Sequence, residues 1–254
     1  MELFSLQKKV AVVIGGSKGL GKGIAIGLAQ AGATVVLGSR NQLELDQAAA
    51  DIRKQGYADV IGLSVDITSV EAIQQFVNEI VKNKGRIDIL VNSAGINIRK
   101  KAVDFTENDW DKVMDIQLKY VFFTNQVVAN YMINEKIRGK IINIASLTSV
   151  LGFKGMVAYC SAKAGIVQMT KALANEWAEY GINVNAIGPG YYETEMTKKL
   201  FSDPKVVESM IGNIPLKRIG MPEDLIGTAV LLASEASTYI TGQVIYVDGG
   251  WLIE

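Results

Sequence analysis

Residues 10–21 read Val10-Ala11-Val12-Val13-Ile14-Gly15-Gly16-Ser17-Lys18-Gly19-Leu20-Gly21, and this stretch decides the fold. An apolar, β-branched run ends in a glycine-rich turn, and a helical pattern of small and apolar residues follows at once. Glycines at 15, 19 and 21 let the backbone turn tightly and approach a pyrophosphate, while the helix N-terminus offers unpaired N–H groups. The stretch therefore predicts a strand, a helix and between them a phosphate-binding loop, with contacts from Gly15, Ser17, Lys18, Gly19, Leu20 and Gly21.

The rest of the chain alternates short β-branched runs with longer helical patterns. We expect strands at Val10–Ile14, Thr34–Gly38, Val60–Ser64, Ile87–Asn92, Lys140–Ala145, Asn183–Ile187 and Gln243–Val247. Helices are expected at Gly21–Ala31, Gln42–Gln55, Ser69–Lys84, Asp109–Asn134 (as two helices in succession), Tyr159–Tyr180 and Pro222–Ser234. This order is typical of a single α/β domain over residues 1–254, a doubly wound parallel sheet of about seven strands with helices on both faces. Residues 189–215 form an irregular connection long enough to be a substrate lid.

The composition excludes several classes of function. The 254 residues include no histidine and one cysteine, and 26 Lys and Arg balance 26 Asp and Glu. Without histidine there is no Ser-His-Asp catalysis and no imidazole metal site, and we expect no bound metal. The balanced charge argues against nucleic acid as a partner. No apolar run reaches the roughly 18 residues of a membrane span, and the first residues lack the apolar core of a signal peptide, so we expect a cytoplasmic chain without a membrane partner.

The end of the second expected strand predicts which dinucleotide binds. An NAD site usually carries Asp or Glu there, to accept a hydrogen bond from the ribose. This chain has Leu37-Gly38-Ser39-Arg40, with no acid. Because a hydroxyl and a guanidinium can bind a 2′-phosphate, Ser39 and Arg40 favour NADP(H), and Lys18 could add a second cation.

A tyrosine and a lysine form the catalytic candidate. Tyr159 and Lys163 are four residues apart in an expected helix, so they share one face. An ammonium beside a phenol lowers the pKa of the phenol and makes it a proton donor or acceptor for a carbonyl or an alcohol. Ser146 follows the fifth strand, where its hydroxyl could orient the substrate oxygen.

Several motifs in order identify a family resemblance. They are Gly15-x-x-x-Gly19-x-Gly21, Asp66, Asn92-Ser93-Ala94-Gly95, Ser146, Tyr159-x-x-x-Lys163, Pro189-Gly190 and Val247-Asp248-Gly249-Gly250-Trp251. With these the chain resembles the short-chain dehydrogenase/reductases over essentially its whole length. Within that family it is most similar to the gluconate 5-dehydrogenase and 2-deoxygluconate 3-dehydrogenase group.

The resemblance implies a Rossmann-type fold and a role for each matched residue. Tyr159 would be the general acid/base, Lys163 would lower its pKa and hold the nicotinamide ribose, and Ser146 would bind the carbonyl oxygen. Further cofactor contacts would come from Asp66 and Ile67 at the adenine, from Asn92, Ala94, Gly95, Pro189 and Gly190 along the cofactor path, and from Thr194 at the carboxamide. Similar proteins are commonly homotetramers.

Three positions depart from the family pattern. Ile14 stands where a threonine is usual, and Ser93 replaces the second asparagine of the Asn-Asn-Ala-Gly motif. Gln117 replaces a catalytic asparagine that holds a water of the proton relay. Glutamine keeps the amide but adds a methylene, so we expect a modified relay that still includes Gln117.

The resemblance implies a small-molecule substrate, a sugar acid such as gluconate/5-ketogluconate. Arg99 could pair with its carboxylate, and Tyr191, Tyr192 and Met196 could close over it. Two alternatives stay open. One is reduction of 3-oxoacyl groups on a carrier protein or of carbonyls in general, which the cations Arg99-Lys100-Lys101 keep in view. The other is an NADPH-sensing regulatory protein without turnover, which Gln117 and Ser93 support.

Overall fold

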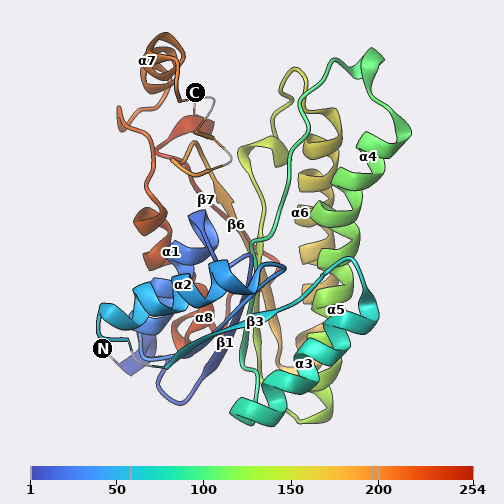
Figure 1. Ribbon diagram of the computed structural model, residues 1–254, viewed down its shortest axis with the longest axis vertical. Coiled ribbons are helices and arrows are strands. Elements are labelled where there is room, and N and C mark those ends of the chain that lie inside the picture. The colour runs from blue at the N-terminus through green and yellow to red at the C-terminus, as the bar shows by residue number, and fades with distance from the viewer. Residues whose placement is uncertain (1, 58, 196, 199–200, 254) are drawn as a thin grey trace.

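The computed structural model describes residues 2–57, 59–195, 197–198 and 201–253 (Figure 1). Its centre is a sheet of seven parallel strands in the order β3-β2-β1-β4-β5-β6-β7. The strands are β1 Val10–Ile14, β2 Thr34–Ser39, β3 Val60–Ser64, β4 Ile89–Asn92, β5 Lys140–Ile144, β6 Asn183–Pro189 and β7 Val244–Val247. The expected doubly wound parallel sheet is confirmed.

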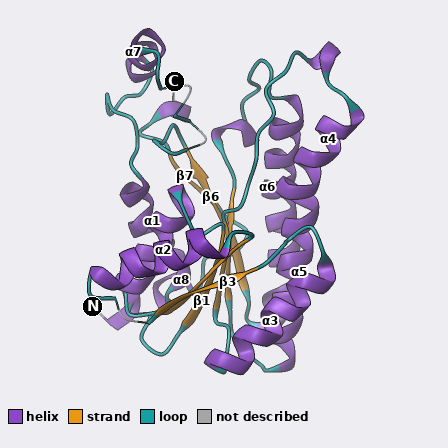
Figure 2. Cartoon of the chain, viewed as in Figure 1, coloured by secondary structure: helices purple, strands orange, loops and turns teal. Residues whose placement is uncertain are grey.

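Helices cover both faces of this sheet (Figure 2). They are α1 Gly19–Gln30, α2 Gln42–Lys54, α3 Val70–Lys84, α4 Glu107–Met114, α5 Tyr120–Asn134, α6 Val157–Trp177, α7 Pro204–Gly212 and α8 Ile226–Ala233. Alternate residues of β1 pack in two core layers, one on each face of the sheet. Ala11 and Val13 pack in the layer of α1, α2 and α8, whereas Val10, Val12 and Ile14 pack in that of α3, α5 and α6. The near-continuous apolar run of β1 thus reflects burial on both faces.

Local sequence signals account for several helix ends. The Asn41 side chain accepts a hydrogen bond from the Glu44 amide at the start of α2, and Ser69 caps α3 in the same way. Gly85 ends α3 with a φ of 79°, a left-handed conformation that suits glycine. The chain around Asp109–Asn134 does form two helices, and one turn of π-helix, Asp115–Lys119, joins them.

The connection 189–215 is more regular than expected. β6 continues to Pro189, and α7 occupies Pro204–Gly212. The start of α7 carries a recognisable local signal, because Asp203 caps the Lys205 amide and Pro204 stands in the first turn. The expectation of an irregular stretch throughout was therefore wrong.

In the part of the chain that the structure describes, no helix combines the length and the apolar character needed to cross a membrane.

Four buried polar side chains join the central strands to the helices beside them. The Asn92 amide donates to the Asn125 and Asn143 side-chain oxygens at 2.6 and 3.0 Å, and Asn125 also donates to Asn143 at 3.2 Å. Asn143 in turn donates to the Thr170 hydroxyl at 3.1 Å. The network ties β4 and β5 to α5 and α6, which carry groups of the site described below.

We predict that Asn143→Ala lowers the free energy of unfolding by about 2–3 kcal/mol, because Asn92 and Asn125 lose a buried acceptor. Urea denaturation measures the effect. The matched control is Asn78→Ala on the exposed face of α3, expected to stay within about 0.5 kcal/mol of wild type. Equal losses in the two variants would contradict a structural role for the network.

Candidate functional site

A cavity of about 760 Å³ opens where β1, β2 and β4 end. This is the point at which the strand order reverses, the usual ligand site of an open parallel sheet. The cavity brings together most of the residues predicted from the sequence. They are Gly15, Ser17, Lys18, Gly19, Leu20, Gly21, Ser39, Arg40, Asp66, Ile67, Ala94, Gly95, Gln117, Tyr159, Lys163 and Thr194.

The glycine loop is shaped by a close approach of two backbone segments. Gly15 has a φ of +77°, and a Cβ at this position would lie 2.6 Å from the Ala94 nitrogen. A Cβ on Gly21 would collide with the Gly15 carbonyl oxygen. The loop therefore requires glycine at both positions, and both glycines line the cavity.

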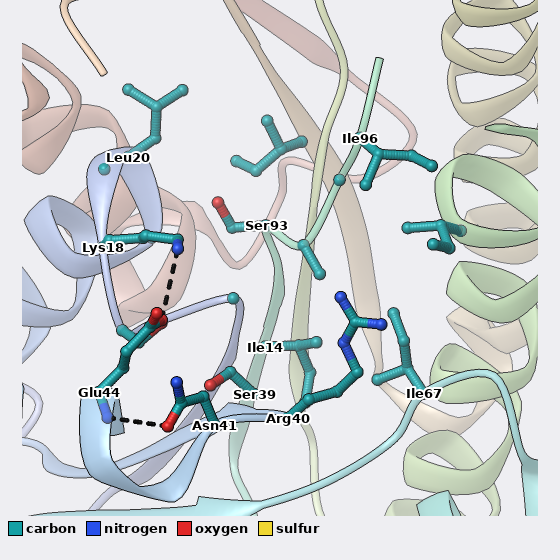
Figure 3. A pocket seen from close by; sticks show the side chains of 18 of the residues that line it. Ile14, Lys18, Leu20, Ser39, Arg40, Asn41, Glu44, Ile67, Ser93 and Ile96 are labelled. Atoms are coloured by element: carbon teal, nitrogen blue, oxygen red, sulfur yellow. Dashed lines mark hydrogen bonds and ion pairs between the residues drawn. The ribbon is translucent and has the colours of Figure 1, made fainter. Parts of the chain in front are cut away.

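The end of β2 presents unused polar groups to the cavity (Figure 3). The Ser39 hydroxyl oxygen is buried and has no hydrogen-bond partner among the described residues. Arg40 is exposed beside it. Lys18 does not stand free, because its Nζ lies 3.3 Å from a carboxylate oxygen of Glu44.

Asp66 is exposed and already engaged locally. Its carboxylate accepts hydrogen bonds from the Thr68 amide at 3.0 Å and the Thr68 hydroxyl at 2.7 Å. These bonds, aided by the charge of Arg40, lower the pKa of Asp66. The carboxylate is thus fixed at the cavity wall beside the buried Ile67.

Tyr159 and Lys163 reach the cavity from the first turns of α6. The Lys163 side chain is buried, and its Nζ donates to the Ile144 carbonyl oxygen at 2.6 Å. The same Nζ lies 5.6 Å from the centre of the Tyr159 ring. Ser146 stands outside the cavity lining but next to Tyr159, and its hydroxyl acts to lower the pKa of that phenol.

Burial dominates the protonation of both groups. Desolvation raises the pKa of Tyr159 to about 12, although the Ser146 hydroxyl and the charge of Arg99 act to lower it. Desolvation lowers the pKa of Lys163 to about 7. The expected lowering of the phenol pKa by Lys163 is therefore not present in this arrangement, because burial outweighs the neighbouring groups.

Gln117 lies in the turn of π-helix between α4 and α5. Its side chain is buried, and its Nε2 donates to the Ile96 carbonyl oxygen at 2.6 Å. Its Oε1 is buried without a hydrogen-bond partner in the described parts of the chain. A Cβ on Gly95 would lie 2.6 Å from Nε2, so glycine at 95 makes room for the longer amide.

Other predicted residues lie outside the cavity lining: Asn92, Arg99, Ser146, Pro189, Gly190, Tyr191 and Tyr192. Tyr192 is buried and donates from its hydroxyl to the Val247 carbonyl oxygen at 2.9 Å, which makes it part of the fold. Tyr191 packs its ring edge-on against Phe153 and Trp251, at 6.5 and 4.8 Å between centres. Met196 lies outside the described residues.

The lining also contains residues that no sequence motif indicated. They include Asn41, Glu44, Val65, Thr68, Ile96, Ile116, Ile144 and Glu195. Glu44 matters most, because its carboxylate binds Lys18 and stands opposite Ser39 and Arg40 (Figure 3). The helix cap at Asn41 could have placed Glu44 in the first turn of α2, at the rim of the cavity.

The comparisons with known proteins agree with this geometry. Residues 15–252 match the family described as enoyl-(acyl carrier protein) reductase. The chain is 43% identical over 252 residues to 2-dehydro-3-deoxy-D-gluconate 5-dehydrogenase of Escherichia coli (strain K12), covering 99% of this chain and 98% of the relative. This chain is a short-chain dehydrogenase/reductase. It is an oxidoreductase, with the family's motifs placed around one cavity.

Two further relatives of this short-chain dehydrogenase/reductase have names that indicate different substrates. One is the structure of a gluconate 5-dehydrogenase from Burkholderia cenocepacia J2315 in complex with NADP and tartrate, with a TM-score of 0.95 and 35% identity, covering 100% of this chain and 98% of that one. The other is 3-oxoacyl-[acyl-carrier-protein] reductase of Thermotoga maritima, 40% identical over 249 residues, covering 98% of this chain and 99% of the relative.

From the lowered pKa of Lys163 we predict how the free energy of unfolding depends on pH. Its value is about 7 in the folded chain against 10.5 for an ordinary lysine. Between these values the unfolded chain binds more protons at this position, so the free energy of unfolding rises with pH across that window. Lys163→Met lacks this contribution and should show a smaller rise between about pH 6 and about pH 9.

Chemical denaturation of the cofactor-free protein at both pH values measures the difference. Lys82→Met, at an exposed position on α3, is the matched control and should rise as wild type does. A Lys163→Met variant with the wild-type slope would show that Lys163 keeps an ordinary pKa in the folded chain.

Proposed function

We propose that this protein is an NADP(H)-dependent oxidoreductase that interconverts a secondary alcohol and a ketone on a sugar acid such as gluconate/5-ketogluconate. The observation that carries the proposal is that Tyr159 and Lys163 line one end of a dinucleotide-sized cavity, with Ser146 next to Tyr159 and the Arg99 charge acting on it. The far end of the same cavity carries Ser39 and Arg40.

The residues present fit NADP(H). The glycine loop offers backbone that a Cβ would obstruct, and the Ser39 hydroxyl is a buried group that lacks a partner among the described residues. Ser39 and Arg40 would bind the 2′-phosphate, with Lys18 nearby. Asp66 and Ile67 would hold the adenine, Ala94, Gly95, Pro189 and Gly190 would border the cofactor, and Thr194 would meet the carboxamide. When bound, the cofactor supplies or accepts the hydride.

Tyr159 handles the proton at its hydroxyl oxygen. Ser146, next to Tyr159, would hold the substrate oxygen and donate to the charge that develops on it. Lys163 is anchored by the Ile144 carbonyl and faces the Tyr159 ring, where protonation of its amine would favour the phenolate. The unpartnered Gln117 Oε1 would accept a hydrogen bond from a water of the proton path.

Arg99 supports a carboxylate substrate. Burial raises the pKa of both Tyr159 and Tyr191, and the charge of Arg99 acts on both phenols in the opposite direction, which links this cation to the catalytic tyrosine and to the ring of Tyr191. A sugar acid bound with its reacting carbon at Tyr159 would present its carboxylate to this cation.

Carrier-protein chemistry and a sensing role are the two alternatives. The Thermotoga maritima relative speaks for a 3-oxoacyl substrate, but Lys100 of the basic run is paired with Asp109, which removes one cation that an acidic carrier would need. A sensor would not require a Ser146 hydroxyl next to Tyr159 and beside a buried Lys163. We also retain as predictions a homotetramer, a cytoplasmic location and a lid at 189–215, of which Thr194 and Glu195 line the cavity.

We predict that the purified enzyme oxidises NADPH in the presence of 5-ketogluconate, followed by nicotinamide absorbance. Tyr159→Phe should lose about a hundredfold or more in kcat because the proton donor is gone. A neutral ketose of the same length, L-sorbose, should show a higher KM because Arg99 has no carboxylate to bind. Turnover of a 3-oxoacyl thioester but not of 5-ketogluconate would transfer the assignment to the carrier-protein alternative, and binding of NADPH without turnover of any ketone would favour the sensor.

For cofactor choice, we predict that Arg40→Gln raises the KM for NADPH by roughly tenfold and leaves the KM for NADH almost unchanged, since it removes a charge-assisted contact to the 2′-phosphate. Steady-state kinetics with both cofactors measure the effect. Lys54→Gln, at the exposed end of α2, has the same change in net charge and should alter neither constant. An equal rise for both cofactors would place Arg40 away from the 2′-phosphate.

A further inference from the structure

A second cavity, also of about 760 Å³, lies at the amino-terminal ends of the strands, opposite the first cavity. Its lining includes Lys9, Asp88, Lys140 and Asn183, which precede or begin β1, β4, β5 and β6. The carboxyl ends of β1, β4 and β5 face the dinucleotide cavity, so the length of these strands separates the two cavities. None of the second cavity's residues has a role in the site described above.

Positive charge exceeds negative charge around this cavity. Asp88 is occupied, because it accepts from Arg86 Nε and Nη2 at 2.9 and 2.7 Å and from the Val10 amide at 2.9 Å. Glu235 lies 3.3 Å from Lys9 Nζ. Two further cations of the lining, Arg138 and Lys140, have no ion-pair partner within the described ranges.

Lys140 is an unusual wall residue because only 5% of it is exposed. Its Nζ donates to the neutral Asn183 oxygen at 2.7 Å, which uses one of three donors. Burial lowers the pKa of Lys140, and the charges of Lys9 and Arg138 lower it further while Glu235 raises it. Lys9 and Arg138 therefore both act on Lys140.

A glycine leaves room for the side chain of Arg138. Gly181 has a φ of +73°, and a Cβ there would lie 3.0 Å from Arg138 Cγ and Nε. The turn after α6 thus leaves space that the arginine stem occupies, and both residues line the cavity. A buried lysine and an arginine that line the same concave site are suited to a ligand of opposite charge.

We propose that this second cavity binds a small anion that carries at least two negative charges, with Lys140 and Arg138 as its charged contacts. The anion supplies the counter-charge that these two residues lack, and a ligand with one charge would neutralise only one of them. Phosphate and carboxylate groups share this chemistry, and inorganic pyrophosphate and citrate serve as the two probes.

Isothermal titration calorimetry with each probe tests the proposal. The wild-type protein should bind at least one of them, and the probe that binds more tightly identifies the ligand as a phosphate or a carboxylate compound. Arg138→Gln should weaken binding by roughly tenfold or more. Lys140→Met keeps an apolar stem in the buried position and should weaken it similarly. If Lys140→Met fails to fold, as judged by circular dichroism, the exposed Arg138 decides the question.

Two control variants distinguish binding in this cavity from binding elsewhere on the protein. Arg40→Gln alters the dinucleotide cavity and should leave the affinity for the probe unchanged. Lys82→Gln has the same change in net charge as Arg138→Gln and should also bind as wild type does. The proposal is overturned if neither probe binds, if Arg40→Gln rather than Arg138→Gln abolishes binding, or if Lys82→Gln weakens binding as much as Arg138→Gln.

Discussion

The close approach of Gly15 to the main chain of Ala94 is the constraint on which the rest of the architecture depends. It brings the loop after β1 against the loop after β4. These are the two neighbouring strands at which the strand order reverses. Only a residue without a Cβ permits this contact, because a Cβ would lie 2.6 Å from a backbone nitrogen. The two halves of the sheet therefore meet at a fixed distance, and one continuous cavity runs across their junction.

Each half contributes a different part of that cavity. The β1-β2-β3 side supplies the glycine loop, Ser39 and Arg40, to which we assign the phosphates of the cofactor. The β4-β5-β6 side supplies the helix with Tyr159 and Lys163, to which we assign the proton transfer, and Ser146 stands next to Tyr159. The buried amides Asn92, Asn125 and Asn143 hold the second half together. In the sequence Asn92 was expected to face the cofactor, whereas the structure turns its side chain into this network.

The sequence predicts much of this arrangement because its signals are local. The order of strands and helices follows from the alternation of apolar runs and caps, and the site follows from spacing within single elements, such as Tyr159 and Lys163 on one helix face. Contacts between elements left no such signal. Glu44 reaches Lys18 from a different helix, and Tyr192 packs in the core with its hydroxyl on the Val247 carbonyl oxygen. The phenol pKa also depends on burial, which a four-residue spacing does not report.

The exposed position of Arg40 and Glu44 has a consequence for protein engineering. Both residues stand at the rim of the cavity and outside the two core layers, whereas Gly15 and Gly21 are confined by neighbouring backbone. With Arg40 assigned to the 2′-phosphate, as we propose, cofactor preference and folding would be encoded in separate residues of the same site. A combinatorial library restricted to the rim explores electrostatic complementarity to different dinucleotides while the scaffold keeps its thermal tolerance.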